Sequence, residues 1–214
     1  MKKTLYFFVL AFGFFCCTAN KQAASDGWIA LFDGKSLNGW KVGDNPETFR
    51  VDSGMIIVNG NTAHLFYEGD VQQHKFKNFE FKADVMTLPG SNSGIYFHTQ
   101  FQQGSWPGKG YEVQVNNSHT DWRRTGSLYG ISDVKEVSVK DNEWFTEYIR
   151  VQGKRVTIKI NDHVVVDYTE PENVLQQRGR DSGRVLSSGT FALQGHDPKS
   201  KVYFKNIVVK PLAD

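Results

Sequence analysis

The chain has 214 residues, a formal net charge of +2 and 14% aromatic residues. This length suits one domain with a substantial core, because all-β sandwiches reach it without dividing. Lysine and arginine are scattered along the chain, and this pattern excludes a nucleic-acid-binding surface.

The N-terminus has the pattern of an export signal. A basic start precedes an apolar run, Leu5–Phe15, which is too short to span a bilayer comfortably. We therefore expect a signal peptide over residues 1–24 and a single domain over residues 25–214. The only cysteines, Cys16 and Cys17, close the apolar run, so the mature domain has no internal disulfide. Both a lipid anchor on one cysteine and ordinary cleavage into the periplasm remain open.

From Asp26 onward the patterns are those of β-strands. Short apolar runs separated by glycine-containing turns predict strands at 49–51, 55–58 and 64–67, with Asn59-Gly60 as a strong turn signal. Apolar and polar residues then alternate strictly from Phe79 to Val85. Further runs predict a three-strand meander at 144–151, 155–160 and 164–168, which we assign to the scaffold. Two closing strands are predicted at 190–196 and 202–209.

The fold class follows from these patterns. No long period of 3.6 residues and no internal repeat occurs after the signal, which excludes helical and solenoid folds. Many short strands with alternating faces favour an all-β, antiparallel two-sheet jelly-roll sandwich. A curved sheet of such a sandwich can offer a concave polar surface.

The best candidate site lies between Pro89 and Asn116. This segment reads as two strands joined by a loop that carries Trp106. Each predicted strand has an apolar face, and the opposite faces carry Tyr96, His98 and Gln100 on one strand and Glu112, Gln114 and Asn116 on the other. If the strands pair, cross-strand neighbours lie about 5 Å apart at Cβ. An ordinary solvated sheet face is the alternative, but these residue types suit sugar recognition better.

Other segments contribute further candidates. The loop SHTDWRRTGSLYG carries Arg124, which could donate to an oxygen-rich ligand or simply be solvated. The same loop leads to Tyr129. A later predicted strand, at 190–196, places Gln194 and His196 on the same face. Asn92 and Lys109, within residues 89–116, complete the set of candidates.

Several blocks together resemble a known family. They are LFDGKSLNGW, NFEFKADV, GSNSGIYFHT, GYEVQV, TGSLYGI, EWFTEYIRVQGKRVTIKINDHVVVDY and SGTFALQGHDPKSKVYFKNIVVKPL. The chain resembles the 3-keto-disaccharide hydrolases, also described as 3-keto-glucoside 1,2-lyases and 3-keto-2-hydroxyglucal hydratases, from about Leu31 to the C-terminus. The resemblance implies a fold similar to concanavalin-A-like lectins and glucanases.

The resemblance also implies chemistry on a sugar that is already oxidised at C3. The ketone acidifies the C2 hydrogen, so a base can remove it, the C1 substituent leaves, and water can add afterwards. Lyase, hydratase and net hydrolase outcomes all remain open. The ketone must come from a separate oxidoreductase, because no GxGxxG motif follows a strand here.

Roles follow as expectations from that chemistry. Glu112 and His98 would supply the general base and acid, in either order. His196 and Gln194 would polarise the C3 oxygen. Tyr129 could donate to the same oxygen or protonate the leaving group. The remaining candidates would bind the sugar. Trp106 would stack on the ring, and Asn92 and Gln114 would bind the hydroxyl groups of the sugar. Further substrate-binding candidates are Tyr96, Lys109 and Arg124.

No cofactor is predicted, and three alternatives stay open. His98, Glu112 and His196 could instead ligate a divalent metal ion, although their spacing matches no short metal motif. A non-catalytic carbohydrate-binding module would keep the sugar-binding residues without turnover. A conventional glycosidase would need two carboxyl groups flanking the bond, whereas the neighbour of Glu112 on its strand face is Gln114, an amide.

Overall fold

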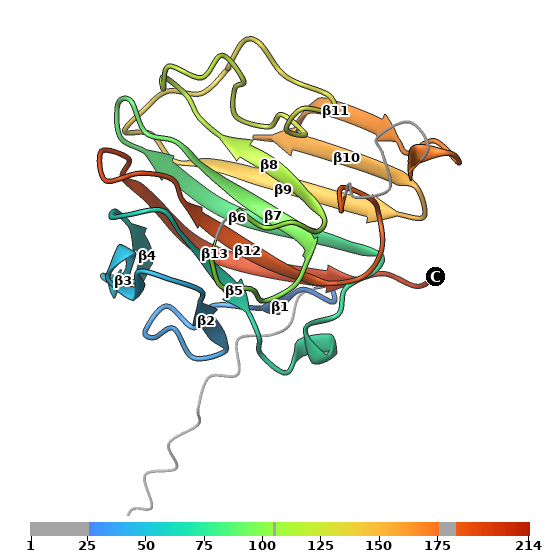
Figure 1. Ribbon diagram of the computed structural model, residues 1–214, viewed down its shortest axis with the longest axis horizontal. Helices are drawn as coiled ribbons and strands as arrows, with labels where there is room; N and C mark the ends of the chain where they lie inside the picture. Colours follow the sequence, from blue (N-terminus) through green and yellow to red (C-terminus); the bar gives the residue numbers. More distant parts are fainter. Residues whose placement is uncertain (1–25, 105, 176–182) are drawn as a thin grey trace, which may run out of the picture.

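Two antiparallel β-sheets pack face to face in the computed structural model of the chain (Figure 1). The structure describes residues 26–104, 106–175 and 183–214, so the predicted signal peptide lies outside the described residues. Within these residues no helix combines the length and the apolar character needed to span a membrane. The all-β, two-sheet antiparallel architecture confirms the predicted fold class.

The larger sheet contains eight strands and carries no candidate site residue on its strands. Its order is β11 (His163–Thr169), β10 (Arg155–Ile160), β9 (Phe145–Gln152), β6 (Phe79–Thr87), β13 (Val202–Pro211), β4 (Met55–Val58) and β3 (Phe49–Asp52), with β1 (Ile29–Ala30) paired to β13. The predicted meander is therefore formed by β9, β10 and β11 and belongs to the scaffold.

The smaller sheet contains five strands and holds the candidate site. Its order is β2 (Trp40–Val42), β5 (Ala63–Tyr67), β12 (Thr190–Gly195), β7 (Ser93–Thr99) and β8 (Tyr111–Val115). Two short 3-10 turns, η1 (Pro46–Thr48) and η2 (Val71–His74), lie in the connections. The predicted pairing of the two strands of the candidate site, β7 and β8, is confirmed, with Tyr96 opposite Glu112 and Gly94 opposite Gln114.

The core fills the space between the sheets. On β6 every second residue is buried, from Phe79 through Phe81 and Ala83 to Val85, as expected for a strand with one face in the core and one in water. Aromatic rings from the two sheets meet there: Phe191 of β12 packs on Phe79 and Phe81 of β6 with ring centroids 4.9 and 4.7 Å apart.

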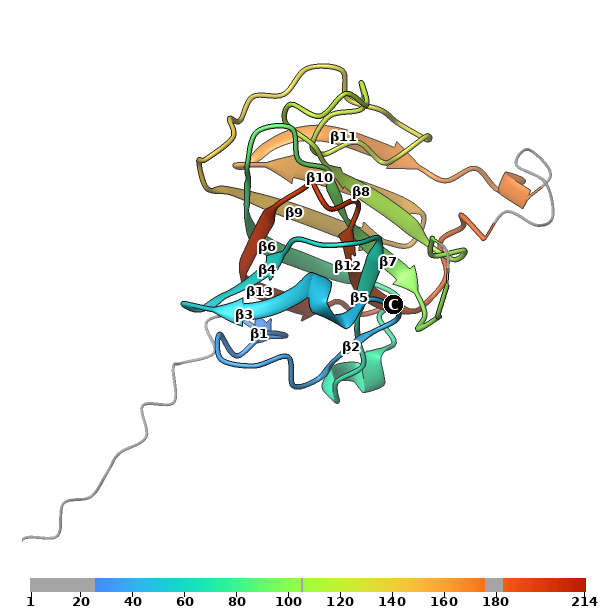
Figure 2. The same cartoon turned by 60° about the vertical axis from the view of Figure 1, so that its left-hand side comes forward.

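The Asn59-Gly60 turn does not close a hairpin between its flanking strands. β4 pairs with β3 and β13 in the larger sheet, whereas β5 pairs with β2 and β12 in the smaller one. The turn instead carries the chain from one sheet to the other (Figure 2). A local turn signal specifies the bend but not the partner of the strand that follows.

The smaller sheet is buried on both faces where the site lies. Every residue of β7, β8 and β12 is buried, including those on the parity that points away from the core. The loops after β7 and β8 run over that outer face (Figure 2). Polar side chains there are shielded from water, unlike those of an ordinary solvated sheet face.

Candidate functional site

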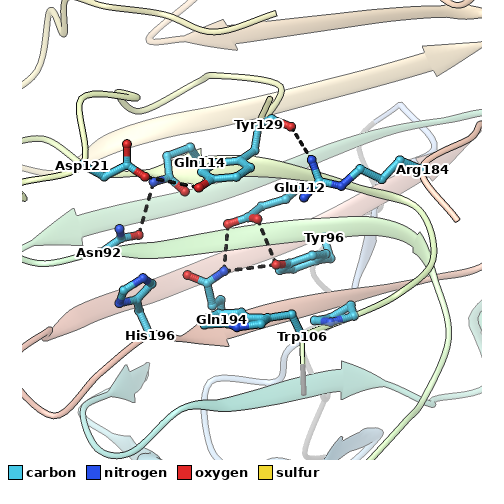
Figure 3. A pocket seen from close by; sticks show the side chains of 11 residues that line it. Asn92, Tyr96, Trp106, Glu112, Gln114, Asp121, Tyr129, Arg184, Gln194 and His196 are labelled. Carbon is cyan, nitrogen blue, oxygen red and sulfur yellow. Dashed lines mark hydrogen bonds between the residues drawn. The ribbon is translucent and has the colours of Figure 1, made fainter. Parts of the chain in front are cut away.

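A polar cavity opens on the outer face of the smaller sheet (Figure 3). Its volume is about 180 Å³, below the roughly 300–1,000 Å³ of pockets that take drug-sized ligands, and so suits one sugar ring at a time. The lining residues come from three strands and the loops above them: Asn92, Tyr96, Trp106, Pro107, Glu112, Gln114, Asp121, Tyr129, Arg184, Gln194 and His196.

Glu112 occupies the floor of this cavity and is 7% exposed. Its Oε1 accepts a hydrogen bond from Gln194 Nε2 at 2.7 Å, and its Oε2 accepts one from the Tyr96 hydroxyl at 2.9 Å. Gln194 Nε2 also reaches the Tyr96 hydroxyl oxygen at 3.2 Å. Both carboxylate oxygens are therefore oriented by donors on other strands, Tyr96 on the adjacent β7 and Gln194 on β12 beyond it.

The environment of Glu112 shifts its acidity. Burial raises the pKa of this carboxyl, while the hydrogen bonds from Tyr96 and Gln194 and the charges of Arg184 and His196 act in the opposite direction. The pKa remains above its ordinary value of 4.5. A carboxylate of raised pKa is a stronger base, which suits it to proton abstraction near neutral pH.

Side chains that can donate and accept hydrogen bonds surround the carboxylate. The carboxamides of Gln114 and Asn92 face each other at 3.3 Å. Across the cavity the Tyr129 hydroxyl donates to Asp121 Oδ2 at 3.3 Å, and Arg184 donates from Nη1 to the Tyr129 carbonyl oxygen at 2.9 Å (Figure 3). Amides, a phenol and a guanidinium offer the mixture of donors and acceptors that a sugar ring requires.

Trp106 supplies the apolar surface of the site. Its side chain is 44% exposed, and its ring lies 5.4 Å from the rings of both His64 and His196. An exposed indole beside a polar cavity can stack on the C–H face of a sugar. His64 beneath it is buried, and burial lowers its pKa to about 4, so this imidazole is neutral.

Most of the predicted site residues are brought together by the structure, and His98 is the main exception. A β-bulge interrupts the pairing of β7 with β12 here, and His98 takes a left-handed conformation with φ of 56°. The extra residue reverses the alternation, so His98 does not line the cavity. Its expected place beside Glu112 is wrong.

His98 packs instead at the end of the core. Its ring lies 5.7 Å from that of Phe79, Nε2 contacts the Lys77 carbonyl oxygen at 2.9 Å, and Nδ1 accepts from the Ser187 N–H at 3.1 Å. Burial lowers its pKa to about 4. With both ring nitrogens engaged by the backbone, His98 is a structural residue here and leaves the set of acid–base candidates.

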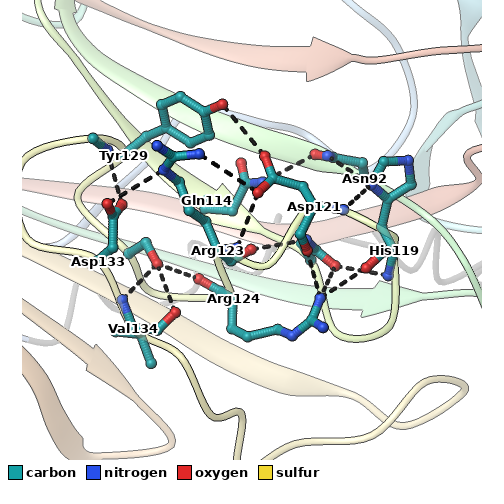
Figure 4. Close-up of polar contacts among 12 residues, drawn as sticks. Asn92, Gln114, His119, Asp121, Arg123, Arg124, Tyr129, Asp133 and Val134 are labelled. Carbon is teal, nitrogen blue, oxygen red and sulfur yellow. Dashed lines mark hydrogen bonds and ion pairs between the residues drawn. The ribbon is translucent and has the colours of Figure 1, made fainter.

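Arg124 and Lys109 also lie outside the cavity. Arg124 donates to the carbonyl oxygens of His119 and Asp121 at 2.8 and 2.7 Å and so organises the loop after β8 (Figure 4). Lys109 donates to the Ser188 carbonyl oxygen at 3.3 Å and lines a different hollow. Neither side chain lines the cavity that contains Glu112.

Sequence reasoning missed Asp121 and Arg184. Asp121 lies in the same loop as Arg124, and its carboxylate accepts the Arg123 N–H at 3.0 Å (Figure 4). Arg184 ends a polar connector without periodicity. Loop residues of this kind carry no strand alternation, so only the folded chain shows where they point.

The metal alternative is not assembled as the sequence suggested, because His98 is remote from the cavity. Within the described residues a different group has metal-ligand spacing, namely His119, His196 and Asp197, whose ligand atoms lie within 4.8 Å of one another. His119 Nδ1 already accepts from the Asp121 N–H at 3.1 Å, which leaves the proton on Nε2. In this arrangement His119 offers no free lone pair to an ion.

Comparison with known proteins adds the family context. The model of a family described as the 3-keto-alpha-glucoside-1,2-lyase-like domain matches residues 27–210. A protein named 3-keto-disaccharide hydrolase from Bacteroides thetaiotaomicron is 29% identical over 88% of this chain and 79% of its own length.

Solved structures show the same fold. A candidate glycosyl hydrolase from Parabacteroides distasonis superposes with a TM-score of 0.73 at 24% identity, covering 87% of this chain and 94% of its own. The carbohydrate-binding module CBM66 from Bacillus subtilis superposes with a TM-score of 0.57 at 14% identity, covering 80% and 95%. At these identities the similarity shows the architecture alone.

Proposed function

The chain belongs to the 3-keto-alpha-glucoside-1,2-lyase-like family, and from this premise we propose that it cleaves 3-keto-glycosides by elimination at C1 and C2, followed by hydration. The observation that carries the proposal is Glu112, a buried carboxylate of raised pKa held by two donors in a cavity for one sugar ring. The name of the Bacteroides relative supports a 3-keto-disaccharide as substrate.

In the first half of the reaction Glu112 takes the proton from C2. The electron pair of the C2–H bond forms an enolate, and negative charge develops on the oxygen at C3. Collapse of the enolate restores the ketone, forms the C1=C2 double bond and breaks the bond from C1 to the leaving oxygen. His196, which lines the same cavity, gives a proton to that oxygen as it departs.

In the second half water adds to the product, a 3-keto-2-hydroxyglucal. His196 takes a proton from water as its oxygen bonds to C1, the enolate forms again, and Glu112 returns a proton to C2. Both residues end in their starting states, and the sum of the two halves is hydrolysis. The same pair of side chains therefore serves lyase and hydratase steps by microscopic reversibility.

Donors in the cavity stabilise the charge that develops at C3. Arg184 brings a positive charge that already lowers the pKa of Glu112, and Tyr129 and Gln114 bring a hydroxyl and a carboxamide. Fixed donors aimed at a developing oxyanion typically contribute about 3–4 kcal/mol each to lowering the barrier. Trp106 would hold the ring by stacking.

A second candidate function is conventional glycoside hydrolysis, and Asp121 is the observation that favours it. The cavity contains two carboxyl groups in different environments: buried Glu112 of raised pKa, and Asp121, which is paired with Arg123 at 3.6 Å. Most glycosidases likewise use a pair of carboxyl groups, one on each side of the bond that is cleaved. That mechanism requires no ketone.

Matched substrates separate these functions. Incubation with a β-glucoside, an α-glucoside and the two corresponding 3-keto-glucosides should release the aglycone only from the oxidised sugars. Release from the unoxidised sugars at a comparable rate would support the glycosidase mechanism instead. Saturable binding without release from any of them would indicate a carbohydrate-binding module.

Two associated proposals follow from the chemistry and the N-terminus. The substrate must be supplied by a separate oxidoreductase that converts the C3 hydroxyl to a ketone. Export through the signal at residues 1–24, with or without a lipid on Cys16 or Cys17, would place the domain where it meets such sugars. Fractionation of cells that express the full chain, with and without both cysteines, tests the location and the anchor.

A further inference from the structure

The chain contains the same four-residue turn twice, and only one copy touches the site. The turns are DGKS at residues 33–36 and DPKS at residues 197–200. In each, the aspartate Oδ1 accepts the N–H groups of the lysine and the serine, at 2.7 and 2.8 Å in the first and at 2.8 and 3.2 Å in the second. Its Oδ2 accepts the serine hydroxyl, at 2.9 and 2.8 Å.

The second turn has one additional contact. Asp197 Oδ2 lies 2.8 Å from His196 Nδ1. Asp33 in the first turn has no histidine beside it, since the preceding residue is Phe32. Turn formation accounts for the shared contacts of both aspartates but does not account for the imidazole held by Asp197.

The contact determines which nitrogen of His196 carries the proton. Burial raises the pKa of Asp197, but the hydrogen bonds from His196, Ser200 and the Lys199 N–H outweigh it and lower the pKa to about 2. The carboxylate is therefore ionised and can only accept. Nδ1 of His196 must donate, which leaves the lone pair on Nε2.

The surroundings hold this imidazole in place. The His196 carbonyl oxygen accepts from the Thr62 hydroxyl at 2.8 Å, and its ring lies 5.4 Å from those of Trp106 and His119. His119 has the opposite tautomer, with its proton on Nε2. His196 is thus the one of these two histidines whose Nε2 can accept a proton in the neutral state.

We propose that Asp197 is a positioning residue that holds His196 with its proton on Nδ1, so that Nε2 exchanges protons with the leaving oxygen and with water. This inference rests on the proposed function, and it adds the residue that fixes the tautomer of His196, the acid–base group of that function. In the elimination half the carboxylate stabilises the imidazolium before it donates. In the hydration half it keeps the Nε2 lone pair available to the attacking water.

Asp197→Asn tests the proposal with Asp33→Asn as its matched control. Asparagine keeps the Oδ1 acceptor of the turn, but its Nδ2 would donate to His196 Nδ1 and move the proton to Nε2. Asp33→Asn makes the same change in the equivalent turn away from the cavity. A difference between the two variants therefore reports the imidazole contact and not the turn.

The first measurement is nitrogen NMR of histidine-labelled protein without substrate, at a pH high enough that the His196 ring is neutral, because only a neutral imidazole has a defined tautomer. We expect the Nδ1–H tautomer for His196 in the wild type and in Asp33→Asn, and the Nε2–H tautomer in Asp197→Asn. An Nε2–H tautomer in the wild type would overturn the proposal. The wild-type spectrum decides this point even if a variant fails to fold.

The second measurement is turnover of a 3-keto-glucoside. We expect Asp197→Asn to lower kcat by about 10² to 10⁴, as orienting carboxylates do in other acid–base enzymes, with KM within about threefold of the wild type. Equal kcat values for Asp197→Asn and Asp33→Asn would overturn the proposal. A wild type that turns over no 3-keto-glucoside would reject the proposed function, and the NMR result would still decide whether Asp197 sets the tautomer of His196.

Discussion

Gln194 Nε2 donates a hydrogen bond to Glu112 Oε1 at 2.7 Å although their strands, β12 and β8, are separated by β7. The contact crosses the intervening strand above Gly94, where no side chain stands in the way. An ideal Cβ on Gly94 would lie 2.5 Å from Glu112 Oε1. The missing side chain is therefore what lets the carboxylate lie across the sheet between its two donors.

Gly94→Ala should displace this carboxylate. The fold should persist, because the atom that the new methyl group meets is the end of a flexible side chain. A displacement of the order of 1 Å costs up to about 100-fold in rate, so we expect kcat for a 3-keto-glucoside to fall by about that factor. Gly108→Ala is the control, since its Cβ would meet only Gln102 Oε1 at 3.9 Å. Equal rates in the two variants would mean that the position of Glu112 is not critical.

Glu112→Gln should abolish proton abstraction while preserving the shape of the cavity. An amide cannot take the C2 proton, so we expect kcat to fall by at least about 100-fold. Glu143→Gln, at an exposed position away from the cavity, should behave as the wild type. Binding of the substrate by Glu112→Gln, followed by calorimetry, should persist. Turnover by this variant at more than a tenth of the wild-type rate would remove Glu112 from the mechanism.

Strand alternation is the part of the site that the sequence could reveal. Tyr96, Glu112, Gln114 and Gln194 lie on regular strands, and a period of two residues places each of them on the outer face. The same reasoning failed at His98, because one left-handed residue in a bulge reverses the parity. The alternation of polar and apolar residues in the sequence does not show where a bulge adds such a residue.

His98→Ala tests that correction. Loss of the ring leaves a cavity beside Phe79 and removes the partners of the Lys77 carbonyl and the Ser187 N–H. We expect a loss of roughly 2–4 kcal/mol in the free energy of unfolding and little change in kcat below the melting temperature. A selective loss of kcat with unchanged stability would restore His98 to the mechanism.

His98 should also make stability depend on pH. Its pKa is lowered from 6.5 to about 4 by burial, so the unfolded chain takes up the proton first. The stabilisation is present above pH 6.5 and is lost as the pH falls towards 4, by up to about 1.4 kcal/mol per pH unit. Urea unfolding at several pH values should show this component in the wild type and not in His98→Ala.

Glu147 gives a pH dependence of the opposite sign. It is fully buried between the sheets, and neither of its oxygens has a hydrogen-bond partner in the described part of the chain. Burial, and then the charge of Glu112, raises its pKa well above 4.5. The folded state therefore favours the protonated acid, and stability is lost as the pH rises above 4.5 towards that raised value.

Glu147→Met should remove this loss. Its free energy of unfolding should exceed that of the wild type by a margin that grows above pH 4.5 by up to about 1.4 kcal/mol per pH unit. Glu143→Gln provides the control for a solvent-exposed carboxyl. A constant difference between Glu147→Met and the wild type across this range would show that Glu147 titrates normally in the folded protein.

The loop residues are the part of the candidate site that could not be predicted from the sequence. Asp121, Arg184 and Asp197 lie outside regular strands, and their directions depend on contacts with distant segments. Asp197 illustrates this most clearly, because its turn sequence is nearly identical to that of Asp33. Only the packing of the second turn beside the cavity gives its aspartate an imidazole to hold.

Proton exchange at C2 is the most direct test of the proposed elimination. Turnover of a 3-keto-glucoside in D₂O, followed by NMR, should give a product whose C2 hydrogen is lost or replaced by deuterium. Free 3-keto-glucose incubated with the protein under the same conditions is the control, and its C2 hydrogen should exchange more slowly. Aglycone release that leaves the original hydrogen on C2 would contradict the elimination and support direct displacement at C1.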